Sequence, residues 1–375
     1  MGDEVLPGSP SAGSELGLSA QYGAPTRSRR GRLRSALRLE LLDPSRIEWQ
    51  RLDQFPDRLV YQTREWVNFI AYSQGAEPVV AALLDRSGTV GYFTGLVRRR
   101  LGFAILGSPM PGWTTAFMGF NLDPGVSRRA ALESLLPFAF SELRCVHLEL
   151  RDRHLLASDV AGLTLKRTPW TGVEVDLGGT EEEIWGALKA PCRTAIRKAQ
   201  RHGVTIEEAT GSDFADDFYP QLEDVFAKQG LVPPYGIERV RELIRFVHPS
   251  GRLLLLRARD AEGTCIATGI FPAMNRTMHF LAGASLREHQ QLRPNEALMW
   301  HAMMHWKSRG VDACDLGGFL SYKRKWGGHE IQVPFLSTSR FRALSLMREA
   351  VRVAHDTRQT IRGRLRYGLR RSSPG

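Results

Sequence analysis

Two short segments combine residue types that can move a proton beside a bound anion. The first, Asp315 to Gly318, ends an apolar run, and its two glycines, Gly317 and Gly318, leave the backbone open to a ligand or free to turn. The second, Tyr322 to Gly328, places two aromatic rings and three cations ahead of another glycine pair. Asp315 is a candidate base or amine anchor, and Tyr322 is a candidate for returning a proton to a leaving group.

Each candidate also has a purely structural interpretation. A strand-end aspartate such as Asp315 often caps a turn, and Tyr322 can pack half-buried against Trp326. Glu296, in the first turn of a predicted helix, is a second candidate base or amine anchor, but a carboxylate there also answers the helix dipole. The residue types alone leave both interpretations open.

A basic stripe lies on a predicted helix that begins at Pro191 and ends at Gly203. Arg193, Arg197 and Arg201 follow one another at i, i+4 and i+8, and like charges on one stripe repel unless anions answer them. We interpret Arg193 and Arg197 as a clamp for a phosphate or carboxylate group. The alternative is a solvated basic face that pairs with nearby acidic side chains.

The elements that position these residues form a β-loop-α-β unit. An apolar run at 278–284 is followed by a polar loop, a helix predicted at 295–309 with Asn295 as its N-cap, and a strand that ends at Asp315. Such a unit places both strands parallel in one sheet, with the loop at their carboxyl ends, where ligands of open α/β sheets bind. We therefore expect one cleft, walled by the arginines of the basic stripe and floored by the two glycines.

Taken in order, the basic stripe and the glycine motifs resemble the FemAB-like branch of the GNAT acyltransferase superfamily. The usual pattern of that branch is R-x-x-[IV]-R-K-A-x-x-x-G-V, then D-L-G-G and F-K-x-x-F-G-G. The matching positions here are Arg193, Ile196, Arg197, Lys198, Ala199, Gly203 and Val204, then Asp315 to Gly318, Tyr322, Lys323, Trp326, Gly327 and Gly328. Tyr and Trp replace Phe in the last motif. The resemblance covers roughly residues 79–340 and is strongest from Trp170 onward.

The resemblance implies an α/β (α+β) fold of two GNAT-like domains, each a mixed, mostly antiparallel sheet flanked by helices. The pattern in the first half agrees, with three strands in 77–106, a helix at 127–143 and a strand at 145–150. The predicted divisions are a disordered basic tail at 1–38, an N-terminal half at 39–169, a C-terminal acyltransferase domain at 170–340 and an Arg-rich amphipathic helix at 341–375.

The chemistry that the resemblance implies is the meeting of an activated carbonyl with an amine. Parted strands at 277–284 and 311–316 would supply a backbone amide to the oxyanion that develops. Lys323 would contact a phosphate or carboxylate. Acceptors in this branch are often lipid-linked precursors of the cell envelope.

The loop before the predicted helix leaves the acyl donor open. GNAT enzymes that use CoA carry glycines there, so that backbone amides at a helix N-terminus cradle the pyrophosphate. Residues 287–296 contain no glycine, which counts against ordinary CoA binding, and the FemAB-like branch often uses aminoacyl-tRNA. Gln290, Gln291 and Arg293 can still hold phosphates through their side chains. We expect no tightly bound cofactor and keep acyl-CoA and aminoacyl-tRNA as alternative donors.

Metal and thiol chemistry are weakly indicated. His301 and His305 stand at i and i+4 on the predicted helix, a spacing that can bind zinc. No metalloprotease glutamate lies between them and no third ligand is evident, so we expect no metal. The four cysteines are scattered without a C-x-x-C pair, which predicts reduced thiols.

The net charge of +11 is carried by the ends of the chain. The first 38 residues carry +3 and the last 35 carry +7, which leaves +1 for the 302 residues between them. A core that binds nucleic acid along its phosphates would carry more, so we expect no DNA partner. No secretory signal and no run of eighteen apolar residues is present. We predict a cytoplasmic protein. For the N-terminal basic segment we favour a solvated tail over contact with anionic lipid or RNA, and for the C-terminal helix we favour the inner face of an anionic membrane over RNA or packing on the protein's own core.

Three functions are compatible with these patterns. The leading hypothesis is an N-acyltransferase that moves an acyl or aminoacyl group to an amine of a phosphate-bearing or lipid-linked cell-envelope precursor. The first alternative is an acyl-CoA-dependent N-acetyltransferase that acts on a small amine or a polysaccharide. The second is a non-catalytic GNAT-fold scaffold that binds anions or membrane.

Overall fold

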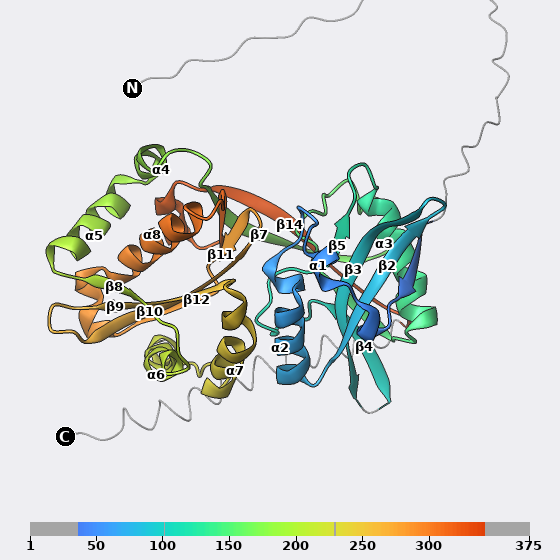
Figure 1. Cartoon of the computed structure of the whole chain (residues 1–375), viewed down its shortest axis with the longest axis horizontal. Coiled ribbons are helices and arrows are strands. Elements are labelled where there is room, and N and C mark those ends of the chain that lie inside the picture. Colours follow the sequence, from blue (N-terminus) through green and yellow to red (C-terminus); the bar gives the residue numbers. More distant parts are fainter. Residues whose placement is uncertain (1–36, 101, 229, 342–375) are drawn as a thin grey trace, which may run out of the picture. The chain divides into compact units, whose positions relative to one another are not determined.

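The computed structural model describes residues 37–341, except 101 and 229. The predicted basic tail and the predicted Arg-rich helix lie outside the described residues, apart from residues 37, 38 and 341. In the described part, strands and helices follow one another as expected for an α/β (α+β) fold (Figure 1). None of the helices described there is long and apolar enough to cross a membrane.

The N-terminal half is built on an antiparallel meander. Its strands are β1 (Arg38–Leu41), β2 (Glu77–Asp85), β3 (Gly88–Arg100), β4 (Phe103–Ser108), β5 (Gly119–Leu122) and β6 (His147–Leu150), and its helices are α1 (Trp49–Leu52), α2 (Arg64–Gln74) and α3 (Arg128–Pro137). Strands β1 to β4 pair antiparallel in chain order, β5 pairs with β3, and β6 returns parallel to β4. The three strands predicted in 77–106 are confirmed.

The helix predicted at 127–143 is shorter in the structure. It ends at Pro137 and continues as a π-helical turn, Phe138–Glu142. Because proline has no amide hydrogen, the regular hydrogen-bond ladder is interrupted at this residue. Helix α2 and strand β5 were not predicted. Strand β5 is four residues long and buried along its whole length, so it shows no alternation of polar and apolar residues.

The C-terminal half has helices on both faces of its sheet. Its strands are β7 (Lys166–Asp176), β8 (Thr205–Glu208), β9 (Leu253–Arg259), β10 (Cys265–Met274), β11 (Thr277–His279), β12 (Ala282–Ser285), β13 (Ala313–Gly318) and β14 (His329–Ser339), and its helices are α4 (Glu181–Ala187), α5 (Ala190–Arg201), α6 (Phe214–Ala227), α7 (Ile237–Val247) and α8 (Pro294–Lys307). In Figure 1, α4, α5 and α8 lie on one face of β8–β10, and α6 and α7 lie on the other.

One sheet runs through both halves. Its strand order is β1-β2-β3-β4-β6-β14-β7-β13-β11-β10-β9-β8, with β5 on β3 and β12 on β10. Strand β14 joins the halves because it pairs antiparallel with β6 and with β7, and its Leu336 lies opposite Leu150 and Arg167. The predicted division between residues 169 and 170 falls inside β7, and the division itself stays a prediction.

The helices of the C-terminal half are held against the sheet by their apolar faces. Helix α5 buries Cys192, Ile196 and Ala199, which follow at i, i+4 and i+7 and join a cluster with α8 and the sheet. Helix α4 begins with a capping box, in which Thr180 and Glu183 each accept a hydrogen bond from the other's amide. On the opposite face, α6 and α7 share a cluster with α2 of the N-terminal half.

The predicted β-loop-α-β unit is present, but its first strand is divided. Strand β11 pairs parallel with β13, as predicted, and places His279 beside Asp315. The apolar run at 278–284 is not one strand, because β12 pairs antiparallel with β10 instead. The candidate site lies where the chain changes from pairing with β13 to pairing with β10.

The start of α8 also differs from the prediction. The helix begins at Pro294 with Arg293 as its N-cap, so the assignment of Asn295 as N-cap is wrong. Proline is favoured at the first helical position because its missing amide hydrogen would have no partner there. The side-chain Nδ2 of Asn295 instead donates to Ser285 Oγ at 2.9 Å, which ties the helix to β12.

Candidate active site

The chain leaves β13 at Phe280. The amide of Phe280 donates to the carbonyl of Asp315 at 2.8 Å, whereas the next amide, that of Leu281, donates to Ile270 on β10 at 3.1 Å. Beyond this point the neighbouring strands diverge, so the predicted parting of 277–284 from 311–316 is confirmed. Two cavities lie beside the opening, and Phe280 lines both of them.

The first cavity has a volume of about 500 Å³ and lies at the N-terminus of α8. We name it the α8 cavity. Its polar lining comprises Thr268, Ser285, Gln290, Arg293, Asn295, Glu296, Tyr322 and Lys325. Three of the residues predicted from the sequence, Arg293, Glu296 and Tyr322, therefore lie around one cavity.

An ion pair occupies one wall of the α8 cavity. Lys325 Nζ donates to Glu296 Oε1 at 2.7 Å, and Glu296 is buried. Glu296 is also the third residue of α8, where the partial positive charge of the helix N-terminus stabilises a carboxylate. The carboxylate is already engaged by Lys325, so a role for Glu296 as an amine anchor requires the amine to replace that cation.

The loop before α8 reaches the cavity through Gln290 and Arg293, and Gln291 does not line it. Gln290 Nε2 donates to Ser285 Oγ at 3.3 Å, while the side chain of Gln291 is exposed. Arg293 adopts φ +62°, a left-handed conformation that a glycine would enter at lower cost. The turn that glycines make in CoA-binding loops is thus made here by an arginine, whose side chain stays beside the helix N-terminus.

Tyr322 stands at the rim of the α8 cavity with 54% of its surface exposed. Burial of the remainder raises the pKa of its hydroxyl above the ordinary value. The hydroxyl is therefore protonated at neutral pH and can donate a proton, as its predicted role requires.

The second cavity has a volume of about 410 Å³ and lies at the end of β13. We name it the β13 cavity. Its lining includes Asp315, Gly317 and Gly318, which were predicted, together with Tyr61, Arg151, Trp170, Tyr235 and His279, which were not. Both halves of the chain contribute to it, because Tyr61 and Arg151 belong to the first half and Tyr235 and His279 to the second.

Asp315 is buried at the floor of the β13 cavity. Its Oδ1 accepts a hydrogen bond from the amide of Gly317 at 2.6 Å, and its Oδ2 lies 3.4 Å from both Arg153 Nη1 and His279 Nδ1. Burial acts to raise the pKa of Asp315, but His279, Arg153 and the Gly317 amide outweigh it, and the pKa lies below its ordinary value. Asp315 is therefore a carboxylate at neutral pH, suited to orienting a neighbour more than to taking a proton itself.

His279 is the neighbour that Asp315 orients. Its ring is buried against Tyr61, with 4.7 Å between ring centroids, and neither ring nitrogen has a hydrogen-bond partner within the described residues. Burial lowers the pKa of His279, and Asp315 offsets this only in part. A neutral imidazole that lines a cavity and is backed by a carboxylate can act as a general base.

Lys323 contacts the backbone of β13. Its Nζ donates to the carbonyls of Leu316 at 2.6 Å and Gly318 at 2.7 Å, and the side chain is buried. Gly317 between them adopts φ +76°, which bends the end of β13 around the ammonium group. The ammonium group is thus engaged by the backbone of β13, and contact with a phosphate or carboxylate of a substrate stays a prediction.

Arg193 and Arg197 do not wall either cavity, so the expectation of one cleft floored by Gly317 and Gly318 is wrong. Arg193 donates to the carbonyls of Gly186 and Leu188, and Arg197 lies over the Trp185 ring at 5.3 Å. The physical cause is the apolar face of α5, which packs on α8 and turns the arginines outward. Arg197 lines a separate surface cavity with Thr194, Gln200 and Arg201.

Arg151 supplies a cation where the predicted arginines do not. It lines the β13 cavity, and its guanidinium lies 5.3 Å from the Trp170 ring and 4.8 Å from the Phe335 ring. Its Nε is buried without a hydrogen-bond partner within the described residues. Burial lowers the pKa of Arg151, yet a guanidinium remains charged at neutral pH. An anionic group in this cavity would meet an accessible positive charge.

Comparison with known proteins identifies a domain family and a similar fold. Residues 188–328 match the family described as acetyltransferase (GNAT) domain. The fold is that of the crystal structure of FemX, with a TM-score of 0.64 at 13% identity over 79% of this chain and 96% of that chain. Residues 188–328 are a GNAT acetyltransferase domain, and the chain has the FemX fold. The resemblance to the FemAB-like branch and the expected fold class are thereby confirmed.

The chain is also similar in fold to a second solved structure. It is a conserved protein of unknown function from Bacteroides thetaiotaomicron VPI-5482, with a TM-score of 0.52 at 9% identity over 80% of this chain and 100% of that chain. The GNAT acyltransferase has no sequence match among curated proteins. As an acyltransferase of this superfamily, it takes an acyl donor and an amine acceptor.

Proposed function

We propose that this acyltransferase moves an acyl or aminoacyl group to an amine of a phosphate-bearing or lipid-linked precursor of the cell envelope. One observation carries the proposal. Phe280, where the chain leaves β13 between β11 and β12, lines both the α8 cavity and the β13 cavity. A donor in one and an acceptor in the other would bring a carbonyl and an amine together at the opening.

The α8 cavity suits the donor. Acyl-CoA and aminoacyl-tRNA both carry phosphates near the activated carbonyl, and the cavity offers Arg293, Lys325 and the N-terminus of α8. Among the described strands β12 pairs with β10 alone, so alternate amides on its other edge face the opening. Such an amide is a suitable donor to an oxyanion. The two donors stay alternatives, and neither is expected to be bound tightly.

The β13 cavity suits the acceptor. Arg151 would attract a phosphate or carboxylate of the acceptor, and the aromatic rings of Tyr61, Trp170 and Tyr235 would contact its apolar parts. His279 lies in the same cavity. An acceptor that is anchored by its anionic group and presents an amine to His279 fits this arrangement.

The proposed reaction is a direct transfer. His279 Nε2 takes the proton of the attacking amine while Asp315 holds the Nδ1 side of the ring. The new C–N bond forms as the bond from the carbonyl carbon to the sulfur of CoA, or to the ribose oxygen of tRNA, breaks. Tyr322 returns a proton to that leaving group. Asp315 thereby changes from a predicted base to a positioning residue.

A cytoplasmic location and contact with an anionic membrane are part of the same proposal. Their support is the basic composition of the two ends of the chain, residues 1–38 and 341–375. A basic amphipathic segment binds anionic lipid by charge and by apolar burial. Such contact would bring the β13 cavity to a lipid-linked acceptor.

An acyl-CoA-dependent N-acetyltransferase of small amines or polysaccharides is the second candidate. The volume of the β13 cavity, about 410 Å³, favours it because sites of this size usually enclose small molecules. In this case the aromatic walls would surround the whole acceptor.

The test is a transfer assay with purified protein. Labelled acetyl-CoA and a labelled aminoacyl-tRNA pool are each incubated with a lipid-linked envelope precursor and with glucosamine. The proposal expects alkali-stable label on the precursor amine from one of the two donors. Label on glucosamine alone selects the second candidate. Binding of both donors without transfer to any acceptor contradicts both functions.

A further inference from the structure

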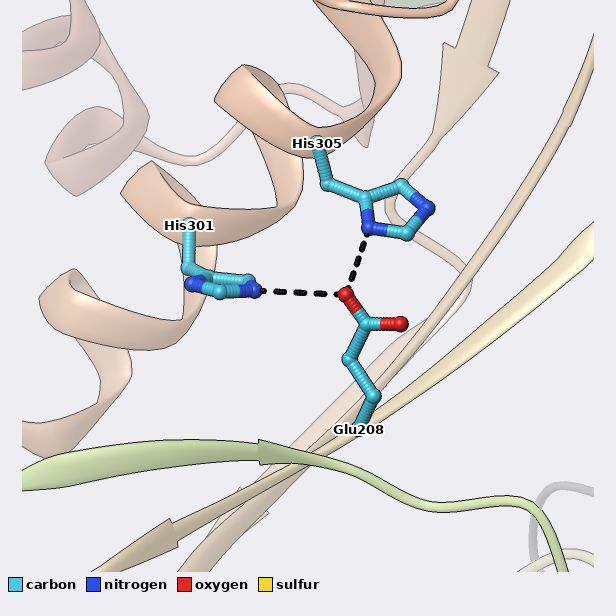
Figure 2. A group of neighbouring side chains, drawn as sticks. All are labelled: Glu208, His301 and His305. Atoms are coloured by element: carbon cyan, nitrogen blue, oxygen red, sulfur yellow. Dashed lines mark hydrogen bonds and ion pairs between the residues drawn. The ribbon is translucent and has the colours of Figure 1, made fainter.

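A cluster of metal-ligating side chains lies away from both cavities, between β8 and α8. It comprises Glu208 at the end of β8 and His301 and His305 on successive turns of α8, and all three donor atoms lie within 4.8 Å of one another. Figure 2 shows both imidazoles directed at the same carboxylate oxygen, Glu208 Oε1. The sequence showed only the two histidines, because Glu208 lies on a distant part of the chain.

Two of the three donor separations can be compared with those of a coordination shell. Glu208 Oε1 lies 2.7 Å from His305 Nδ1 and 3.7 Å from His301 Nε2. Around a tetrahedral zinc ion, with ligands at about 2.0–2.1 Å, neighbouring ligand atoms are about 3.3 Å apart. The two measured distances fall on either side of this value, so small side-chain rotations would equalise them.

A hydrogen bond alone explains only one side of the cluster. The Glu208–His305 contact is an ordinary hydrogen bond, but 3.7 Å is too long for one between Glu208 and His301. Helix α8 nevertheless places His301 and its lone pair beside the same oxygen. An ion between the three groups would engage all of them at once.

The ligand types also suit a metal, because imidazole and carboxylate groups both coordinate zinc. Arg309 donates to the backbone carbonyl of His305.

We propose that Glu208, His301 and His305 bind one divalent ion of the zinc class. Two imidazoles and one carboxylate are a usual protein ligand set for zinc, with water in the fourth position. The ion would fasten β8, the last strand at this edge of the sheet, to α8. His301 and His305 lie five and nine residues beyond Glu296, about 8 and 14 Å along the helix, and neither cavity is lined by any of the three ligands, so the ion would stabilise the fold and take no part in acyl transfer.

The test is a metal titration of the full-length chain, expressed without a histidine tag and dialysed against a chelator. Calorimetric titration with Zn²⁺ is expected to give one ion per chain and a higher melting temperature. Titration with Co²⁺ is expected to give visible absorption bands of four-coordinate cobalt. The spectrum needs no variant, and its absence overturns the proposal.

Variants assign the binding to these three residues. Glu208→Gln and His301→Gln are each expected to weaken Zn²⁺ binding at least tenfold and to remove the increase in melting temperature. His202→Gln is the matched control, because His202 is an exposed histidine outside the cluster. Both ligand side chains are partly exposed, so the variants should fold, which circular dichroism checks. Equal affinity in the wild type and in both ligand variants overturns the proposal.

Discussion

Asp315 and His279 lie side by side on the parallel strands β13 and β11, with 3.4 Å between Asp315 Oδ2 and His279 Nδ1. The amide of Gly317 donates to the other oxygen, Asp315 Oδ1, and fixes the carboxylate. At 3.4 Å the carboxylate acts on the imidazole by charge and offsets part of the effect of burial on its pKa, without a hydrogen bond that fixes the tautomer. The pair is therefore the strongest candidate for the acid–base group of the reaction.

Replacement of His279 tests this role. His279→Asn is expected to lower kcat by about 10²–10⁴-fold, the usual contribution of a general base. The Michaelis constants for donor and acceptor should change little, because the ring makes no binding contact in the proposal. Steady-state kinetics in the transfer assay measure both quantities.

Two comparisons keep this prediction specific. His202→Asn replaces an exposed histidine and should leave kcat unchanged. Asp315→Asn should also lower kcat, but less than His279→Asn, because it removes the orientation of the base and keeps the base itself. A kcat for His279→Asn within about threefold of wild type would exclude His279 as the base.

The burial of His279 also predicts how stability depends on pH. The pKa of His279 is lower in the folded chain than its ordinary value of 6.5. Between the folded pKa and 6.5 the unfolded chain binds more protons, so the stability that is present above pH 6.5 is lost as the pH falls. The slope from this one group cannot exceed about 1.4 kcal/mol per pH unit. Urea unfolding from pH 7.5 to 5 should show it.

A variant separates His279 from the other titrating groups. His279→Phe keeps a ring against Tyr61 and removes the titration, so its stability should fall less between pH 6.5 and 5 than that of the wild type. Parallel curves for the two proteins would mean that His279 is not buried as a neutral ring.

Arg151 provides the test of the acceptor side. Arg151→Met keeps an apolar stem between Trp170 and Phe335 but removes the charge. It should raise the Michaelis constant for a phosphate-bearing acceptor at least tenfold, because a hydrogen bond to a charged group contributes about 1.5–3 kcal/mol. The dissociation constant of the donor should not change.

The control for Arg151 is an exposed arginine that lines neither cavity. Arg167 donates to the backbone carbonyl of Leu163 and lines neither cavity, so Arg167→Met should leave both constants unchanged. An unchanged Michaelis constant in Arg151→Met would show that the acceptor does not place its anion in the β13 cavity.

The outward stripe of α5 distinguishes the two donors. The first turn of α5 lies beside the α8 cavity, because the amide of Lys189 donates to the carbonyl of Lys325 at 2.9 Å. A small donor would not reach Arg197 and Arg201, whereas the long phosphate backbone of tRNA would. Arg197→Ala with Arg201→Ala should therefore raise the Michaelis constant for aminoacyl-tRNA and weaken its salt dependence. The same pair should leave kinetics with acyl-CoA unchanged, so an effect on both donors would contradict this geometry.

Local patterns were sufficient to predict much of the second half. The helix predicted from Pro191 to Gly203 is present as α5, Ala190–Arg201, and the predicted β11–β13 pairing is also present. Apolar periodicity and strong start and stop residues act within a few positions along the chain. The same information was available for α5. Its buried face already implied that Arg193 and Arg197 point outward, which the prediction of an arginine-walled cleft overlooked.

The residues that were missed depend on contacts between distant segments. His279 gains its role only from its register with Asp315, and Arg151 reaches the β13 cavity from the other half of the chain. Glu208 meets His301 only because β8 runs under α8. No local pattern reports such contacts.

The segment that carries Tyr322 and Lys325 depends on a glycine at its end. Gly327 has φ +76°, and a β-carbon there would lie 2.3 Å from the backbone oxygen of Ala187. Gly310 has a similar φ of +86°, but a β-carbon there would meet nothing within 4 Å. The two positions share the cost of a left-handed conformation and differ in the close contact.

Alanine substitution at the two glycines measures that contact. Gly310→Ala should lower the free energy of unfolding by about 1–2 kcal/mol, the cost of a left-handed residue with a β-carbon. Gly327→Ala should lower it by about 1–3 kcal/mol more, because backbone must move to make room. Urea unfolding measures both. Because Gly327→Ala displaces the segment that carries Tyr322, it should also lower transfer activity, whereas Gly310→Ala should not. Equal effects of the two substitutions would mean that Ala187 does not hold the Tyr322 segment against α4.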